Sequence, residues 1–288
     1  MGIDEVVILL LGIATGIATL VLISLGLAVI FGMMKVINFA HGEFLMLGAF
    51  FTLTGVRLGI PLWISMILAS LGTGLLGVVV ERALIRRFYG RTEVTILATF
   101  GLSLVLTQVA LLIWGTSPEG IATPLGKMTI GSYSIANYRL VLIVGAAGLL
   151  VLAWMVFTRT RVGLMARAAT ERPEMASSLG INISNVNMFT FGFGSALAGA
   201  GGALLSPVVA IAATMGTVYI ARAFMTVVVG GPGVITGVSL SASGLGAIER
   251  LVAQWSGPMA GIAALLFAAI IALRFLPTGI SGKLGKRL

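Results

Sequence analysis

The stretch Gly32–Gly48, GMMKVINFAHGEFLMLG, decides the fold of this 288-residue chain. Long apolar runs flank it on both sides, and within it stand four polar residues: Lys35, Asn38, His41 and Glu43. A charged side chain at the centre of a membrane helix costs roughly 2.5–3.5 kcal/mol on insertion scales, so such groups face protein or a polar cavity. We therefore expect Asn38, His41 and Glu43 to form a polar core within a membrane-embedded segment.

This stretch is expected to open a membrane span that ends near Val56. On a helix, Lys35, Asn38 and His41 lie three residues apart and would share one side, whereas Glu43 would point elsewhere. That geometry argues against a catalytic pair made of Glu43 and His41, the only histidine of the chain.

The composition places most of the chain in lipid. Hydrophobic residues make up 58% of it, charged residues only 9%, and the mean hydropathy is +1.12, whereas a soluble protein is about one-quarter charged. Apolar runs of about 20 residues are long enough to cross a hydrocarbon core of roughly 30 Å as helices. The predicted fold is an all-α polytopic membrane protein with about eight transmembrane helices, and residues 1–288 form a single transmembrane domain.

The apolar runs give the individual spans. They are expected over Val6–Phe31, from the polar stretch to Val56, over Leu62–Val80, Val94–Trp114 and Leu140–Phe157, from Met188 onward and over Met259–Leu276.

The net charge of +9 comes from basic residues that cluster between these runs. Such clusters keep loops on the cytoplasmic side, so the positive charge indicates how the chain is oriented in the membrane. It gives no reason to expect nucleic-acid binding. The loops Glu81–Arg91 and Arg159–Asn187 are expected there, and so is the C-terminal tail with Lys283, Lys286 and Arg287. The acidic start MGIDEVV is expected on the outer side.

The segment Tyr219–Arg250 is interrupted by Gly230, Gly231, Pro232 and Gly233, which a continuous span would not need. A broken or re-entrant pair fits better, because freed backbone groups are tolerated where protein or a cavity surrounds them. Eight simple crossings would place both termini on one side, in conflict with their charges. Either this segment crosses twice or not at all, or another predicted span is not a crossing.

The loop Arg159–Asn187 carries a short helical pattern with Leu164 and Ala168 on its apolar side. Pro173 breaks that helix or opens a second one. From the residues alone, the loop is either a solvated linker between spans or a docking surface for a soluble partner.

Sequence signals for catalysis are missing. The chain has no GxxxxGK[ST] phosphate loop, no HExxH and no GxSxG, and it contains no cysteine. A single histidine cannot supply a two-histidine metal site. We therefore predict a protein that is not an enzyme, binds no cofactor or metal of its own and does not hydrolyse ATP.

The uninterrupted NFAHGE at Asn38–Glu43 resembles the permease subunits of ABC importers for branched-chain amino acids, the LivH type. Similarity continues nearly throughout the chain, in ERALIRRFYGR (Glu81–Arg91), LATFGLSLVL (Leu97–Leu106), FGFGSALAGAGGAL (Phe191–Leu204), AFMTVVVGGPG (Ala223–Gly233) and RFLPTGISG (Arg274–Gly282). The loop RTRVGLMARAATERPEMASSLGIN (Arg159–Asn182) looks like the cytoplasmic coupling region of these permeases.

The resemblance implies a multi-pass subunit of a bacterial or archaeal inner membrane. It would pair with a second related permease, or with another copy of itself, and with two cytoplasmic ATPases that use the ATP. An extracytoplasmic binding protein would deliver the solute. Asn38, His41 and Glu43 would then border the translocation path. The loop over about 159–187 would dock the ATPases through Arg167, Glu174, Ala176 and Gly180, of which the last three stand in an E-x-A-x-x-x-G order reminiscent of the coupling motif of ABC permeases.

Two points qualify the resemblance. Permeases of this type usually carry a small polar residue after Gly-Gly-x-Gly, whereas Val234 follows Gly233 here. Several motifs also resemble the branch that transports urea and short amides, so the solute stays open.

The alternative is a self-sufficient channel or secondary carrier, which would need its own ion-coupling groups. The acids within or bordering the spans are Glu43, Glu81 and Glu249, and the last two each have an arginine beside them in sequence.

Overall fold

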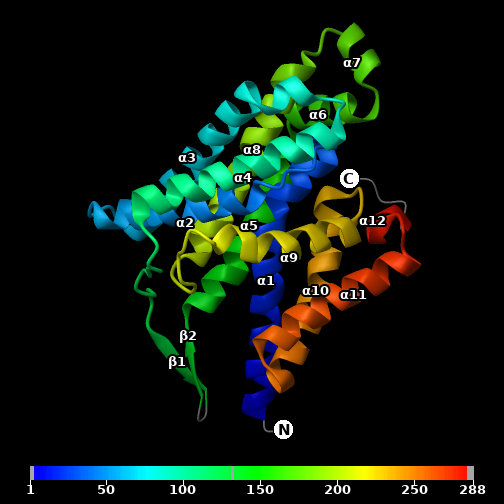
Figure 1. Ribbon diagram of the computed structural model, residues 1–288. Coiled ribbons are helices and arrows are strands. Elements are labelled where there is room, and N and C mark those ends of the chain that lie inside the picture. Colours follow the sequence, from blue (N-terminus) through cyan, green and yellow to red (C-terminus); the bar gives the residue numbers. More distant parts are fainter. Residues whose placement is uncertain (1–2, 131–132, 284–288) are drawn as a thin grey trace.

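The computed structural model describes residues 3–130 and 133–283 as a bundle of helices with one small hairpin (Figure 1). Lys286 and Arg287 of the predicted cytoplasmic tail lie outside the described residues. The first half contains α1 (Ile3–Met34), α2 (His41–Arg57), α3 (Leu62–Ala83), the 3-10 turn η1 (Ile85–Phe88), α4 (Thr92–Trp114), β1 (Lys127–Ile130) and β2 (Tyr133–Ala136). The second contains α5 (Tyr138–Arg159), α6 (Arg161–Glu171), α7 (Pro173–Ser178), α8 (Ile183–Leu205), α9 (Met215–Gly230), α10 (Val234–Ser256), α11 (Pro258–Phe275) and α12 (Gly279–Lys283).

The polytopic helical class is confirmed, but the count of about eight spans is not. By length and composition, six stretches of helix in the described part of the chain are able to cross a membrane: α1, α3, α4, α5, α8 and the stretch Pro258–Gly282. The pair α9 and α10 is bent by 115° at the predicted break and makes a seventh span if it counts as one. At 17 residues and 1.5 Å per residue, α2 is about 26 Å long, shorter than a full crossing.

The prediction that the polar stretch is helical from Lys35 onward is wrong. Helix α1 ends at Met34, and Lys35 adopts a left-handed conformation with φ of 54° while its N–H still donates to the Phe31 carbonyl at 2.9 Å. Residues up to Ala40 are irregular, because the Asn38 side chain accepts a hydrogen bond from the Ala40 N–H at 3.1 Å and so competes with helix formation. Consequently Lys35, Asn38 and His41 do not share a helical face.

Helix α8 lies at the centre and packs against α1, α2 and α3. Glycines permit the close approach: a Cβ atom on Gly202 would collide with the Leu45 carbonyl oxygen of α2, and one on Gly194 would lie 2.8 Å from the Gly26 carbonyl oxygen of α1. Leucine, isoleucine and phenylalanine side chains of α1, α2 and α8 fill the surrounding core.

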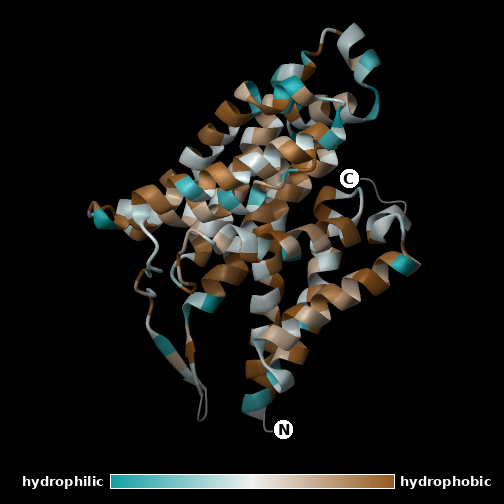
Figure 2. Cartoon of the chain, viewed as in Figure 1, coloured by the Kyte–Doolittle hydropathy of each residue, from teal (hydrophilic) through white to brown (hydrophobic). Residues whose placement is uncertain are grey.

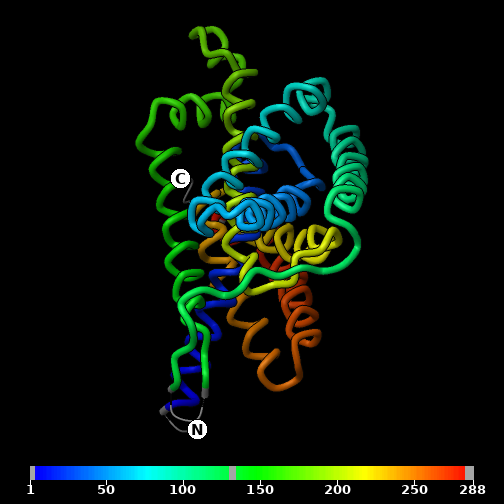
Figure 3. Tube along the Cα trace, turned by 90° about the vertical axis from the view of Figure 1, so that its left-hand side faces the viewer, coloured from blue at the N-terminus to red at the C-terminus, as the bar shows by residue number. Residues whose placement is uncertain are grey.

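The molecule has two distinct ends, which Figures 1 and 3 show at the top and bottom of the bundle. Helices α6 and α7 and the turn after them, residues 161–180, project at one end and are called the arm. The N-terminus and the antiparallel β1–β2 hairpin lie at the other end, called the hairpin end. Figure 2 shows hydrophilic residues gathered on the arm, while apolar residues cover the helices between the ends. The hairpin falls in Gly115–Tyr138, where no strand was predicted.

A candidate translocation path and a docking arm

The irregular segment Lys35–Ala40 is held against α4. The Phe39 N–H donates to the Thr99 hydroxyl at 3.2 Å, and that hydroxyl lies 3.4 Å from the Ile37 carbonyl oxygen. Asn38 is fully buried in this segment, with its Oδ1 atom engaged by the Ala40 N–H. Thr99 therefore fixes the backbone that carries Asn38, a role that no feature of the sequence indicated.

His41 begins α2 beside the middle of α1. Its Nε2 atom lies 2.9 Å from the Ile23 carbonyl oxygen. A carbonyl oxygen only accepts, so Nε2 carries the proton and donates, which leaves Nδ1 as an acceptor. The ring is 1% exposed, and its close packing depends on Gly26, whose Cβ position lies 3.1 Å from the ring carbon Cε1.

Glu43 lies in the first turn of α2, with 2% of its surface exposed. Gly216, the second residue of α9, is its neighbour: a Cβ atom there would stand 2.9 Å from Glu43 Oε1. The Ser103 hydroxyl of α4 also interacts with this carboxylate. Because the backbone N–H groups of a first helical turn favour negative charge, the adjoining first turns of α2 and α9 offset part of the cost of burying this carboxyl group.

The predicted polar core retains unused hydrogen-bonding capacity. Among the described residues, Asn38 Nδ2, His41 Nδ1 and Glu43 Oε2 are buried and have no hydrogen-bond partner. Buried polar atoms are nearly always paired, so three unpaired ones on one short segment make it a candidate site for a polar solute or water. They supply a donor, an acceptor and a carboxylate oxygen. No group of three metal-binding side chains occurs in the part of the chain that the structure describes.

The break between α9 and α10 is closed by the C-terminal motif. The Ser281 hydroxyl of α12 accepts from the Gly233 N–H at 2.9 Å and donates to the Gly230 carbonyl at 2.6 Å. Gly231 has a φ of 81°, and a Cβ atom on it would lie 2.7 Å from the Thr278 carbonyl oxygen. Pro232 completes the turn. Sequence alone predicted the break but not that the distant segment containing Ser281 pairs with it.

The arm presents the predicted docking residues differently. Glu174 is exposed on α7, which Pro173 opens as its first residue, and Gly180 is exposed with a φ of 84° after α7. Ala176 is buried and Arg167 is half-buried. The arm is fastened to the bundle by the Thr170 hydroxyl, which donates to the Met33 carbonyl at the end of α1.

A cavity of about 530 Å³ brings two of the predicted sites together. It is lined by Arg167 of the arm, Pro232 of the helix break and Lys35 at the end of α1, among other residues. A neighbouring cavity of about 460 Å³ is lined by Lys35, Thr170 and Arg91. Asn38, His41 and Glu43 line neither cavity, although the segment that starts at Lys35 leads directly to them.

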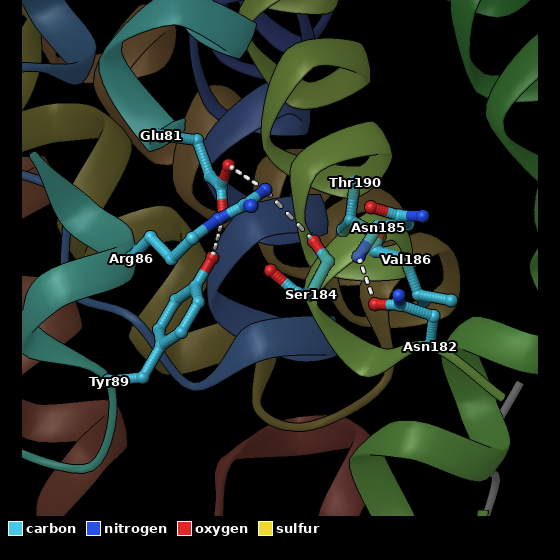
Figure 4. Close-up of polar contacts among 8 residues, drawn as sticks. All are labelled: Glu81, Arg86, Tyr89, Asn182, Ser184, Asn185, Val186 and Thr190. Atoms are coloured by element: carbon cyan, nitrogen blue, oxygen red, sulfur yellow. Dashed lines mark hydrogen bonds and ion pairs between the residues drawn. The ribbon is translucent and has the colours of Figure 1, made fainter. Parts of the chain in front are cut away.

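Two of the acids in or near the spans, Glu81 and Glu249, pair with arginines that are not their immediate neighbours in sequence. Figure 4 shows Glu81, at the end of α3, receiving hydrogen bonds from Arg86 Nη2 at 3.0 Å and from the Tyr89 hydroxyl at 2.6 Å. The same guanidinium lies 3.5 Å from the Ser184 carbonyl oxygen of α8. Burial, and then the hydrogen bond to Glu81, raise the pKa of Tyr89. Glu249 pairs with Arg222 at 3.0 Å. Neither glutamate uses the arginine next to it in sequence.

Comparison with known proteins supports the resemblance to branched-chain amino acid permeases. Residues 9–276 match the family model described as "Branched-chain amino acid transport system / permease component". The chain is 29% identical to the branched-chain amino acid permease protein BraD of Pseudomonas aeruginosa, with 94% of each chain covered. It is 28% identical to the permease protein LivH of Escherichia coli, again with 94% of each covered, and 26% identical to the probable LivH of Methanocaldococcus jannaschii, with 93% and 90% covered.

No solved structure matches the chain significantly. The family match covers nearly the whole length, including the polar segment, the arm and the helix break. The chain therefore belongs to the permease family of branched-chain amino acid transport systems.

Proposed function

We propose that this chain is the membrane-spanning permease subunit of an ATP-driven ABC importer for branched-chain amino acids. The observation that carries the proposal is the arm, which exposes large apolar side chains on a hydrophilic extension. Leu164 is 61% exposed, Met175 57% and Leu179 82%. Apolar side chains gathered on an otherwise polar projection are typical of a protein interaction site.

The arm fits a cytoplasmic ATPase. It lies at the same end as Arg91, since Arg91 and Thr170 line one cavity, and basic loops of this kind face the cytoplasm. Two ATPase subunits, which hold the ATP, would seat on Leu179 and Met175, with Glu174 and Arg172 forming a charged border.

Movement of the arm has a direct route to the polar segment. The Thr170 hydroxyl donates to the Met33 carbonyl, and the irregular segment with Asn38 follows two residues later at Lys35. Arg167 also borders the helix break at Pro232. When ATP binding closes the ATPases, the arm moves, and the helices rock so that the path opens alternately to the two sides. This motion follows the general logic of alternating access.

The solute would pass Asn38, His41 and Glu43. The unpaired donor, acceptor and carboxylate oxygen on these residues suit the polar groups of a small solute. The names of the relatives, BraD and LivH, support branched-chain amino acids. No feature of the described residues favours urea or short amides over them.

The remaining partners follow from the same proposal. A second related permease, or another copy of this chain, would complete the membrane part, and an extracytoplasmic binding protein would deliver the solute at the hairpin end. The exposed apolar faces of α4 and α11, which include Leu112 and Phe267, are suited to lipid or to that second permease. The chain would lie in a bacterial or archaeal inner membrane with its C-terminus in the cytoplasm.

The test is purification of the tagged chain from its native cells in mild detergent, with co-purifying proteins identified by mass spectrometry. We expect two ATPases and a second permease, and ATP-dependent leucine uptake once the complex and its binding protein are placed in liposomes. The double variant Met175→Asp/Leu179→Asp should lose the ATPases, whereas Met128→Asp, an exposed methionine of the hairpin, should keep them. A chain that purifies alone and conducts solute without ATP would refute the importer.

A further inference from the structure

A cavity of about 320 Å³ near the hairpin end contains an unusual number of arginines. Arg139 of α5, Arg222 of α9 and Arg250 of α10 line it, together with Glu249. Helices α5 and α10 both pack against α1, and the cavity reaches α1 at Gly12 and Thr15, in its N-terminal half (Figure 1). Arginines normally concentrate in cytoplasmic loops, so this group at the opposite end from the arm requires a separate explanation.

The charges of the cavity do not balance. Glu249 is its one acidic lining residue and pairs with Arg222 at 3.0 Å, while the Arg222 guanidinium also stacks on the Tyr219 ring at 4.7 Å. Arg139 and Arg250 form no ion pair with any carboxylate of the described residues. Buried Arg222 Nε likewise lacks a hydrogen-bond partner in the described part of the chain. Partly buried guanidinium groups without a counter-charge favour the binding of an anion.

The position of Arg250 is built into the neighbouring helix. A Cβ atom on Gly12 would lie 3.1 Å from Arg250 Nε, and one on Gly16 would lie 3.6 Å from Arg250 Cβ. The Arg250 side chain therefore packs against the two glycines of α1, and larger residues at these positions would displace it. The GxxxG spacing of these glycines serves this side chain and the close passage of α10 at Gly246.

Part of the cavity wall is apolar, and a second cavity continues toward the hairpin. Aliphatic side chains line this part of the cavity, among them Leu142, Leu205 and Val208. A smaller cavity of about 150 Å³ shares Arg139 and Arg250 and extends to Ile8, Leu9, Ser134 and Gln254. A volume near 300 Å³ with apolar walls and a few convergent polar groups is typical of a small-molecule site.

We propose that this cavity is a binding site for a small solute that carries a carboxylate and an aliphatic group. Arg139 and Arg250 would bind the carboxylate, Glu249 would lie beside an amino group, and Leu142 and Val208 would cover the aliphatic chain. The proposal rests on the proposed import of amino acids and adds a solute site distinct from Asn38, His41 and Glu43, near the outer entrance. The phosphate of an anionic lipid offers similar chemistry, and the test separates the two.

The experiment measures binding of radiolabelled leucine to the purified chain in nanodiscs of zwitterionic lipid, with the ATPases absent. Saturable binding is expected, with competition by leucine and not by leucinamide, which lacks the carboxylate. The double variant Arg139→Gln/Arg250→Gln should weaken binding about tenfold or more, because two charge-assisted contacts are lost. Arg250→Lys, which keeps the charge, should retain measurable binding.

The control Arg87→Gln/Arg161→Gln removes the same charge from exposed positions at the other end and should bind leucine normally. Equal binding by the wild type and the Arg139/Arg250 double variant would overturn the proposal. The proposal would also be overturned if the wild type does not bind leucine but native mass spectrometry shows that it retains an anionic lipid, which the double variant loses. ATP-driven uptake by the whole importer, unchanged in the double variant, would refute this site and leave the importer intact. Absence of such uptake in the wild type would refute the importer itself.

Discussion

Glu81 shows how one residue holds two helices together. Its carboxylate is fully buried, and the groups that stabilise it, Arg86 and Tyr89, come from the turn after α3. Since the guanidinium also approaches the Ser184 carbonyl of α8, the cluster fixes the position of α8 just after the arm. A buried carboxylate deprived of a partner is costly, so the cluster is sensitive to single substitutions.

We therefore predict that Tyr89→Phe lowers the stability of the protein by about 1–3 kcal/mol, the cost of one hydrogen bond to a buried charge. Arg86→Ala should lower it further, and Arg87→Ala, an exposed arginine next to it, should have little effect. The pKa of Tyr89 is raised in the folded protein. Its contribution to the free energy of unfolding is therefore complete below the ordinary tyrosine pKa near 10 and falls at higher pH.

The measurement is thermal unfolding in detergent from pH 6 to pH 11. The difference between wild type and Tyr89→Phe should stay constant up to about pH 9 and shrink above about pH 10, because only the wild type must keep a phenol protonated there. A difference that grows with pH would show that the phenol does not donate to Glu81.

At the scale of elements, small residues decide how the helices cross. Gly194, Ala198 and Gly202 are spaced four residues apart on α8, and this ridge of small residues lies against the backbones of α1 and α2. Without a hydrophobic force between helices in lipid, such close contact supplies most of the association energy. The crossing should therefore be intolerant of an added methyl group.

Gly202→Ala should disrupt the bundle, because the new Cβ would collide with the Leu45 carbonyl oxygen, a backbone atom that cannot rotate away. We expect loss of about 1–3 kcal/mol or more, seen as aggregation or an early melting transition. Gly148→Ala makes the same change on α5, where nothing lies within 4 Å, and should be neutral or slightly stabilising. Equal behaviour of the two variants would contradict this packing.

The elements also show where sequence reasoning reached its limit. The helix break at Gly230–Gly233 was predictable, since its glycines and proline mark it locally. The loss of helix at Lys35–Ala40 was not, because it depends on Thr99, which is distant in sequence, and on a left-handed lysine. The arginine partners of Glu81 and Glu249 were missed because proximity in sequence favours the adjacent arginines, Arg82 and Arg250; the actual partners are Arg86, five residues from Glu81, and Arg222, 27 residues from Glu249. A short helix in the loop Arg159–Asn187, broken or followed by a second one at Pro173, was predicted from the residues, but its anchoring by Thr170 required the tertiary structure.

At the scale of the molecule, the two unusual segments resolve the conflict over the termini. Arg57 at the end of α2 pairs with Glu119, which lies before the hairpin, so the chain crosses from the arm end to the hairpin end between Lys35 and Arg57. The pair α9 and α10 starts shortly after Ile211, whose backbone pairs with that of Glu119. Near the end of α10, Arg250 lies against Gly12 in the N-terminal half of α1. The pair therefore enters and leaves at the hairpin end and adds no net crossing.

In the described part of the chain, six helical stretches are long enough to span, and the stretch from Lys35 to Arg57, which joins the irregular segment to the short helix α2, adds a seventh crossing. Seven is an odd number. We therefore predict that the acidic N-terminus lies outside and the C-terminus in the cytoplasm, in agreement with the charges of the two ends. Because the chain contains no cysteine, single cysteines report this arrangement without background. In intact spheroplasts, a membrane-impermeant maleimide should label Asp4→Cys and Thr129→Cys, both exposed near the hairpin end. Ser177→Cys, exposed on the arm, should react only after the membrane is opened. Labelling of Ser177→Cys from outside would show that the arm lies on the outer side of the membrane, where it could not contact a cytoplasmic ATPase.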